Sequence, residues 1–232
     1  ARDLRGPALA DDAFVRACEG LLEALRRSHP EYLFSNRIAL TETETTLAND
    51  AGLDLVNRDR SVVVALIIKH RDSVHIFDAG LFRQDRAFDA EALLADAREL
   101  LDAFGRKAVR PVGEKVLAVL QADLVLGKLE ESLNGESVAK GASLFCGRMG
   151  ERLFSPAFSL VQDRTDEAYH VPFFDMEGVV NPGDRVPLIE NGVLLRPYSD
   201  RKAAALLGEP STGAASGAYD ETPGLSGTNL SI

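Results

Sequence analysis

Several residue types are scarce in this 232-residue sequence. It has no tryptophan, and its two cysteines, Cys18 and Cys146, lie far apart without a framework of spaced pairs. This excludes a disulfide-stapled fold and favours a reducing compartment. The longest apolar run, Val62–Ile68, is far shorter than the roughly 20 residues that cross a bilayer, so we interpret it as a buried strand. The chain begins Ala-Arg-Asp without a hydrophobic leader, and we therefore expect a cytoplasmic protein.

Positive charge is also in deficit. The 26 lysines and arginines are outnumbered by 36 aspartates and glutamates, which gives a net charge of −10. A chain of this charge is repelled by phosphate backbones and anionic lipid surfaces, so neither nucleic acid nor a membrane is an expected partner. Hydrophobic residues make up 45% of the sequence, which is enough to bury a core.

The first part of the chain predicts a helix, a set of strands and a second helix. Apolar residues recur at spacings of three and four behind Asp11 and again before Gly105, as in amphipathic helices. Between these stretches, period-two runs are separated by charged clusters and by a turn at residues 49–52. The expected elements are a helix from residue 11 to 28, strands at 32–46, 53–57, 61–70 and 73–82, and a helix at 88–104.

The second part also mixes both element types. Helical spacing predicts helices at 122–133 and 201–207, and apolar runs predict strands at 115–121, 158–162 and 185–190. Asn191-Gly192, between Leu188-Ile189 and Val193-Leu194, is a strong hairpin signal. We expect the Gly- and Ser-rich tail at 211–227 to be a flexible or ligand-facing loop. The prediction is therefore an α+β fold of antiparallel sheets with flanking helices, divided at a Pro- and Gly-containing link into regions 1–110 and 111–232.

No stretch of the sequence carries a complete catalytic motif. The four histidines include no pair spaced to bind a metal from one helix. Serines lie outside any Gly-x-Ser-x-Gly elbow, and Cys146 lacks the context of an activated thiol. Asp175, Glu177 and His170 could form an acid–base site, although neighbouring acids usually belong to a solvated face or a turn.

A series of short motifs resembles the TldD/PmbA family of peptidase proteins. Although no single motif is decisive, their order and intervals are specific. They are Leu126-Gly127-Lys128-Leu129, residues 134–143 (NGESVAKGAS), residues 150–156 (GERLFSP), residues 174–179 (FDMEGV), residues 188–194 (LIENGVL) and Ser211-Thr212-Gly213. Leu47-Ala48-Asn49-Asp50-Ala51-Gly52 is similar to that family's middle region, so the resemblance covers most of the chain from about Leu40 onward.

The resemblance implies a two-part system. Its TldD members are zinc peptidases with a His-Glu-x-x-x-His helix and a cysteine near the C-terminus, whereas the homologous PmbA (or TldE) members lack the metal. Such pairs degrade or trim unfolded peptides, including peptide-antibiotic precursors. In this chain the corresponding positions carry Gly127, Lys128 and Ser132, which supply neither imidazole nor carboxylate. The PmbA-type side is favoured, although family members usually have a further N-terminal domain and a longer C-terminal segment.

We therefore expect a non-catalytic PmbA/TldE-like subunit of a TldD/PmbA-type metallopeptidase assembly that acts on unfolded or precursor peptides. It would have no catalytic residue, metal or cofactor of its own, and its partner would be a TldD-like zinc subunit or further copies of itself. A strand edge in the second half, with the possible peptide-facing residues Ser211, Thr212 and Gly213, would pair with extended peptide. Two alternatives remain open: an independent hydrolase with a carboxylate/His site, and a homo-oligomeric peptide-binding scaffold.

Overall fold

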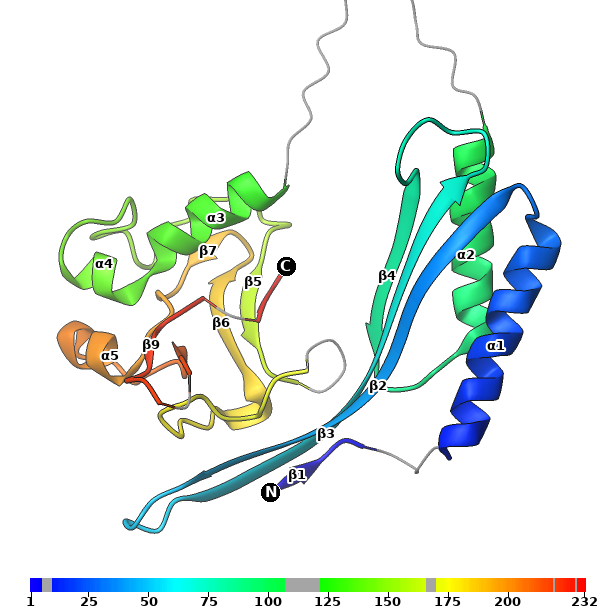
Figure 1. Cartoon of the computed structure of the whole chain (residues 1–232). Coiled ribbons are helices and arrows are strands. Elements are labelled where there is room, and N and C mark those ends of the chain that lie inside the picture. The colour runs from blue at the N-terminus through cyan, green and yellow to red at the C-terminus, as the bar shows by residue number, and fades with distance from the viewer. Residues whose placement is uncertain (6–9, 107–121, 166–169, 219, 228) are drawn as a thin grey trace, which may run out of the picture. The chain divides into compact units, whose positions relative to one another are not determined.

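A computed structural model of the chain describes residues 1–5, 10–106, 122–165, 170–218, 220–227 and 229–232. Helices and antiparallel sheets both occur, which confirms the predicted α+β class (Figure 1). The chain divides into two compact units. Unit 1 comprises residues 1–2, 45–57 and 116–232, and unit 2 comprises residues 3–44 and 58–115. The boundary predicted at 110/111 lies outside the described residues and stays a prediction.

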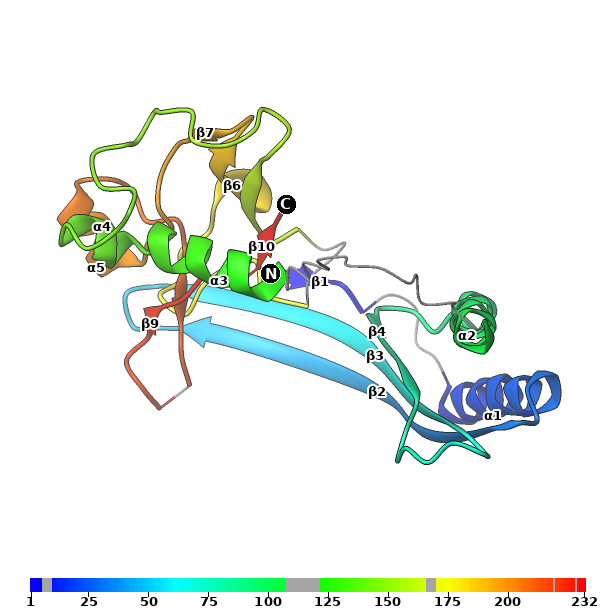
Figure 2. The same cartoon turned by 90° about the horizontal axis from the view of Figure 1, so that it is seen from above.

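Unit 2 contains two helices on one face of an antiparallel sheet. The helices are α1 (Asp11–Ser28) and α2 (Ala90–Gly105), and Figure 2 shows both on the same side of the strands. β1 (Arg2–Asp3), β2 (Tyr32–Ala48) and β4 (Ala79–Asp85) all pair with the central strand β3 (Asp54–His70). In the β3–β4 register, Val62 lies opposite Asp85 and Ile68 lies opposite Ala79.

The core of unit 2 follows from the alternation of side chains along β3. Val62, Val64, Leu66 and Ile68 are all at most 2% exposed, because every second residue of a strand points to the same face. They pack against apolar residues of the two helices, which are Leu21, Leu22, Leu25, Leu93, Ala97 and Leu101. This alternation explains why Val62–Ile68 was recognisable as a buried strand in the sequence.

Two strand predictions in this unit are wrong. The charged cluster Arg58-Asp59-Arg60 does not interrupt the sheet, because the strands predicted at 53–57 and 61–70 form the single strand β3. Cross-strand ion pairs accommodate the charges, with Arg58 on Glu44 at 2.6 Å and Arg60 on Glu42 at 2.6 Å. The strand predicted at 73–82 is β4, which begins only at Ala79; His75 therefore lies in the preceding connection.

Unit 1 combines short helices with a second antiparallel sheet. The helices are α3 (Ala122–Leu133), α4 (Gly135–Ala139) and α5 (Arg201–Leu207), with the 3-10 turn η1 (Pro182–Asp184). The sheet order is β10-β5-β6-β7, and β8 and β9 form a separate pair. The strands are β5 (Leu160–Asp163), β6 (Arg185–Glu190), β7 (Val193–Leu194), β8 (Ala215–Ser216), β9 (Gly224–Leu225) and β10 (Leu230–Ser231).

Several sequence predictions for unit 1 are confirmed. α3, α5 and β6 have the predicted bounds. The predicted hairpin joins β6 to β7, with positive φ values of 48° at Asn191 and 80° at Gly192, as a tight two-residue turn requires. The strand predicted at 158–162 begins two residues late, at Leu160. The strand predicted at 115–121 lies outside the described residues.

The prediction of a loosely packed tail is wrong for the start of that segment. Thr212, Ala214 and Ala215 are at most 3% exposed, and β8 and β9 pair within the tail. The prediction failed because small and polar residues are common both in flexible loops and in buried segments where two backbones approach closely.

Candidate functional site

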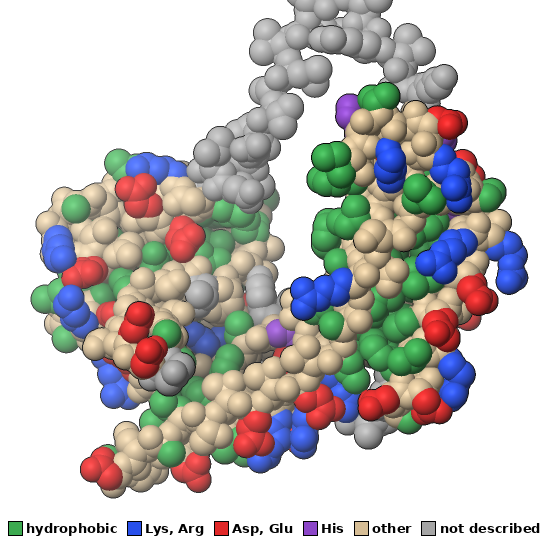
Figure 3. Space-filling view, viewed as in Figure 1, with side chains coloured by type: hydrophobic (Ala, Val, Ile, Leu, Met, Phe, Trp, Pro, Cys, Tyr) green, Lys and Arg blue, Asp and Glu red, His purple; other side chains and the backbone are tan. Residues whose placement is uncertain are grey.

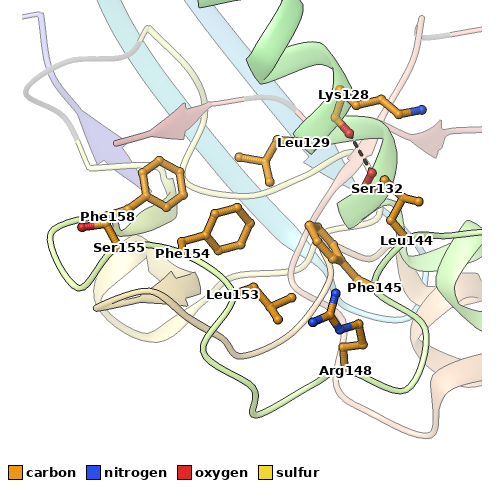
Figure 4. Close-up of a pocket in the computed structure, with 10 residues that line it drawn as sticks. All are labelled: Lys128, Leu129, Ser132, Leu144, Phe145, Arg148, Leu153, Phe154, Ser155 and Phe158. Atoms are coloured by element: carbon orange, nitrogen blue, oxygen red, sulfur yellow. Dashed lines mark hydrogen bonds between the residues drawn. The ribbon is translucent and has the colours of Figure 1, made fainter.

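An apolar pocket lies beside α3 in unit 1. Its volume is about 790 Å³, within the range of ligand-binding sites. α3 contributes one wall, and the segment from Leu144 to Phe158 contributes the rest (Figure 4). The lining residues are Lys128, Leu129, Ser132, Leu144, Phe145, Arg148, Leu153, Phe154, Ser155 and Phe158.

Three phenylalanines form the aromatic side of this pocket. The ring centroids of Phe145 and Phe154 are 6.0 Å apart at an edge-to-face angle of 77°, and those of Phe154 and Phe158 are 5.2 Å apart. Figure 4 shows these rings turned toward the same space as Leu129 and Leu153. Ring contacts of this geometry restrain the side chains that make them, so the aromatic wall is preorganised. An apolar group, aliphatic or aromatic, is the kind of group that this wall would hold.

A close backbone contact supports the aromatic wall from behind. The carbonyl oxygen of Gly192 accepts hydrogen bonds from the N–H groups of Leu153 and Phe154, at 2.9 and 3.1 Å. A Cβ on Gly192 would lie only 2.3 Å from the carbonyl oxygen of Phe154. Glycine is therefore needed at this turn both for its positive φ and for the close approach.

The rim of the pocket carries charges that are already paired. The ammonium of Lys128 lies 2.8 Å from Glu131, and the guanidinium of Arg148 lies 3.0 Å from Glu151. In Figure 4 the Lys128 ammonium points away from the aromatic rings. Because each cation has a carboxylate three residues further along the chain as its partner, the mouth of the pocket has little net charge.

The residues of α3 do not fit a catalytic zinc. The helix contains neither histidine nor cysteine along its whole length, and zinc in enzymes is held chiefly by these side chains. Of the three predicted degenerate positions, Gly127 is exposed, Lys128 is ion-paired and Ser132 is 4% exposed. The Ser132 hydroxyl donates to the carbonyl oxygen of Lys128 at 2.8 Å, as helical serines often do.

No other metal-binding cluster is found in the part of the chain that the structure describes. Those residues contain no group of three or more His, Cys, Asp or Glu side chains placed to hold an ion. His29 lies at the C-terminus of α1, 3.7 Å from Asp102. His70 ends β3, and its ring contacts Tyr32 with centroids 5.2 Å apart. The structure therefore brings none of these histidines together around a common centre.

The acidic residues considered as an acid–base site have structural roles. Asp175 is 2% exposed, and its carboxylate accepts backbone N–H bonds from Glu177, Val179 and Ala215 at 2.8–3.1 Å. Glu177 in turn accepts a bond from the N–H of Arg201 at the start of α5, at 2.8 Å. These hydrogen bonds tie both carboxylates to main-chain N–H groups, so each of them orders the backbone around it.

A buried arginine, which sequence reasoning missed, fixes the same region. Arg164 is 5% exposed and donates to the carbonyl oxygens of Pro172, Phe174 and Gly213 at 2.8–3.0 Å. Burial lowers the pKa of its guanidinium, because desolvation disfavours the charged form. No motif around Arg164 signalled this role, since its three acceptors are main-chain oxygens distant in the sequence.

The predicted peptide-facing residues are placed against the loop that precedes α5. Ser211 donates to the carbonyl oxygen of Ser199 at 3.0 Å, and Thr212 is 3% exposed. Gly213 has a positive φ of 74°, and a Cβ there would lie 3.0 Å from the side-chain nitrogen of Asn181. Whether this segment contacts peptide stays a prediction.

The pocket residues themselves were also missed by sequence reasoning. Phe154 and Phe158 lie four residues apart in Phe-Ser-Pro-Ala-Phe, and Phe145 lies nine residues earlier. The i, i+4 spacing is a weak signal because Pro156 excludes a helix there. Only the tertiary fold shows that the three rings meet.

The edge strands of the four-stranded sheet in unit 1 are too short to pair with a long added strand. The outer strands of its four-stranded sheet, β7 and β10, are each two residues long. An edge of this length provides few backbone groups for an added strand. The apolar pocket is therefore a stronger candidate for peptide contact than these edges.

Comparison with known proteins identifies relatives of this chain. Residues 117–232 match the model of the PmbA/TldA metallopeptidase C-terminal domain. An uncharacterized protein of Methanocaldococcus jannaschii is 30% identical over 189 residues, which cover 80% of this chain and 44% of that protein. A metalloprotease of Methanothermobacter thermautotrophicus is 30% identical over 137 residues, which cover 54% of this chain and 30% of that protein.

A solved structure shows the same fold. TldE from Thermococcus kodakarensis superposes with a TM-score of 0.68 at 20% identity, over 94% of this chain and 51% of that chain. The sequence thus spans about half the length, or less, of the relatives that it matches. The domain match, the curated relatives and the shared fold agree with the motif series, and the chain belongs to the TldD/PmbA family.

Proposed function

We propose that this chain is a non-catalytic, PmbA/TldE-type subunit of a metallopeptidase assembly that acts on unfolded or precursor peptides. The observation that carries the proposal is the composition of α3. Its residues offer no imidazole or thiolate, and Lys128 places a cation where the family's zinc motif has its catalytic glutamate. An ammonium repels a dication and cannot act as a base toward its bound water.

The pocket beside α3 gives such a subunit a role in peptide binding. Unfolded peptides expose the apolar side chains that folded proteins bury, and the pocket offers them three phenylalanine rings and three leucines that line one cavity. Binding through side-chain apolarity selects for unfoldedness rather than for a particular sequence. The catalytic zinc would be supplied by a homologous TldD-type partner, and we place the assembly in the cytoplasm.

Zinc content and peptidase activity of the purified chain test the non-catalytic role. The chain alone should contain no stoichiometric zinc by elemental analysis and should leave a disordered peptide uncut. Addition of the TldD-type peptidase from the same organism should produce cleavage. Stoichiometric zinc together with turnover by the chain alone would refute the proposal.

The pocket's role needs a separate measurement. Phe158→Ala should weaken binding of a disordered, phenylalanine-containing peptide by about tenfold, which corresponds to the loss of one aromatic contact of about 1.4 kcal/mol. Phe104→Ala is the matched control, because Phe104 lies on α2 at 46% exposure and is not among the residues that line the pocket. Equal loss of affinity in both variants would argue against the pocket as the binding site.

A further inference from the structure

The sheet of unit 2 has one face that the helices do not cover. β3 buries Val62, Val64, Leu66 and Ile68 under α1 and α2, so the alternate residues Val63, Ala65 and Ile67 point to the opposite face. An open antiparallel face usually carries polar side chains. Here its central strand presents consecutive apolar ones, which are partly exposed.

The strand register places three particular residues in one row across this face. Ala65 lies opposite Phe82 in the β3–β4 pair. Two backbone hydrogen bonds fix the register of β2 against β3. The N–H of Asn49 donates to Leu53 at one end of the pair and the N–H of Arg71 donates to Glu31 at the other, and both fit the same alignment of the two strands. The ion pair between Arg60 and Glu42 fits this alignment as well. That register puts Arg37 of β2 opposite Ala65, so the row runs Phe82, Ala65, Arg37.

The two ends of this row are exposed. Phe82 is 67% exposed, and its ring leans over Gly80, where a Cβ would lie 2.7 Å from it. Arg37 is also exposed and forms no hydrogen bond or ion pair within the described residues. Ala65 between them is small, so an approaching surface can come close at the centre of the row.

Further apolar side chains extend this surface. Leu33 on the same face is 43% exposed, and the β3–β4 connection exposes Val74 at 94%, Ile76 at 86% and Phe77 at 61%. Figure 3 shows hydrophobic side chains along unit 2 beside β4 and this connection. The connection is held in place, because the Lys69 ammonium donates to the carbonyl oxygens of Ser73 and His75. These apolar groups are therefore presented by ordered backbone.

The central part of the open face carries no carboxylate, and Asp59, the preceding β3 residue on the same face, is ion-paired with Arg86. The alternation of the strands places on it Leu33, Ser35, Arg37 and Ala39 of β2, Ser61, Val63, Ala65, Ile67 and Lys69 of β3, and Gly80, Phe82 and Gln84 of β4. An apolar centre with a polar rim and few charges is the anatomy of a protein–protein interface.

We propose that this open face binds the same face of a second copy of the chain. A two-fold axis running along β3 above Ala65 exchanges the two ends of the row, so Arg37 of each copy lies over Phe82 of the other. Each contact is then a cation–π interaction, and the pair is self-complementary, as a two-fold interface requires. The inference concerns unit 2 alone and does not rest on the proposed function.

The area of the open face sets the expected affinity of the dimer. Three strands about 4.8 Å apart, with about nine residues each at ~3.3 Å rise, cover about 400 Å² per partner. This is about half the area of a standard interface, so the dimer should be weak and visible only at micromolar concentrations or above. Sedimentation equilibrium of the full chain between about 1 and 200 μM covers the relevant range.

Charge and aromatic variants test the contact. Arg37→Glu and Phe82→Ser should each raise the dimer dissociation constant by about tenfold or more, because each removes one partner of both cation–π pairs. Arg27→Glu on α1 and Phe104→Ser on α2 are matched controls that should leave it unchanged. Circular dichroism of each variant checks that the fold is retained.

Cross-linking tests the geometry directly. With Cys18 and Cys146 replaced by serine, an Arg37→Cys chain mixed with a Phe82→Cys chain should be joined by a short bismaleimide. A mixture of Arg37→Cys with Phe104→Cys should not be joined. A monomer throughout the concentration range would overturn the proposal, and so would a dimer that is unaffected by Phe82→Ser. Capture of the disordered peptide in place of a second copy, abolished by Phe82→Ser, would also overturn it.

Discussion

Ser199 and Thr212 form reciprocal hydrogen bonds, in which the side chain of each accepts from the backbone N–H of the other. The N–H of Ser199 donates to the Thr212 hydroxyl at 2.8 Å, and the N–H of Thr212 donates to the Ser199 hydroxyl at 3.1 Å. The Thr212 hydroxyl in turn donates to the carbonyl oxygen of Ser199 at 3.2 Å. Both residues are at most 3% exposed, so this exchange replaces water at buried polar groups.

Replacement of Thr212 by valine should destabilise unit 1. Valine keeps the shape of threonine but leaves the Ser199 N–H without its acceptor, which costs about 1–3 kcal/mol for a buried group. Urea denaturation followed by circular dichroism measures the change. Thr212→Ser keeps the hydroxyl and should lose less stability. A loss in Thr212→Val no larger than that in Thr212→Ser would contradict the role assigned to the hydroxyl.

Replacement of Gly192 by alanine should weaken the turn behind the pocket. The added Cβ would meet the Phe154 carbonyl oxygen at 2.3 Å at a φ of 80°, so strain of about 1–3 kcal/mol is expected. Gly127→Ala on α3 is the matched control, because its Cβ would meet nothing within 4 Å. That variant should gain up to about 1 kcal/mol from helix propensity, and a loss in Gly127→Ala alone would contradict the account.

Replacement of Arg164 by methionine should be among the most damaging changes in unit 1. It removes the Arg164 donor from the carbonyl oxygens of Pro172, Phe174 and Gly213, although Gly213 keeps a hydrogen bond from Gln162. We expect a cost of about 3–5 kcal/mol. Arg185→Met removes an ion pair in which Arg185 is exposed and Asp163 is buried. It should cost less, about 1 kcal/mol, because the solvent around Arg185 screens the pair. Unfolding midpoints in urea compare the two variants, and similar midpoints would contradict the assigned role of Arg164.

The stability of unit 1 should depend on pH through Glu136. Hydrogen bonds from Lys140 and Lys202 lower the pKa of this carboxyl from 4.5 to about 2. Because the folded pKa lies below the unfolded one, the contribution is present above pH 4.5 and is lost as the pH falls toward 2. Glu136→Gln should therefore lower the melting temperature slightly at neutral pH and have no effect near pH 2. The difference should also shrink at 1 M salt, since both partners are exposed; a difference that persists near pH 2 would contradict the assignment.

Local patterns predicted a large part of the fold. The spacing of apolar residues predicted α3 and α5 with their observed bounds, and Asn191-Gly192 predicted the β6–β7 turn. These features depend on the backbone preferences of residues that are neighbours in the sequence, so they can be predicted without knowledge of the fold. The same is true of the missing imidazoles on α3, because the absence of a side chain type is a property of the sequence alone.

Tertiary contacts decided the rest. Arg58 and Arg60 continue a strand only because Glu44 and Glu42 face them across the sheet, and Thr212 is buried only because Ser199 lies against it. The phenylalanines of the pocket, and the row of Phe82, Ala65 and Arg37, likewise come from separate segments. The sequence by itself determined α3, α5, β6 and the β6–β7 turn, and that α3 carries neither histidine nor cysteine. Only the folded chain decided which distant side chains meet, because such contacts depend on strand register and packing that no local pattern specifies.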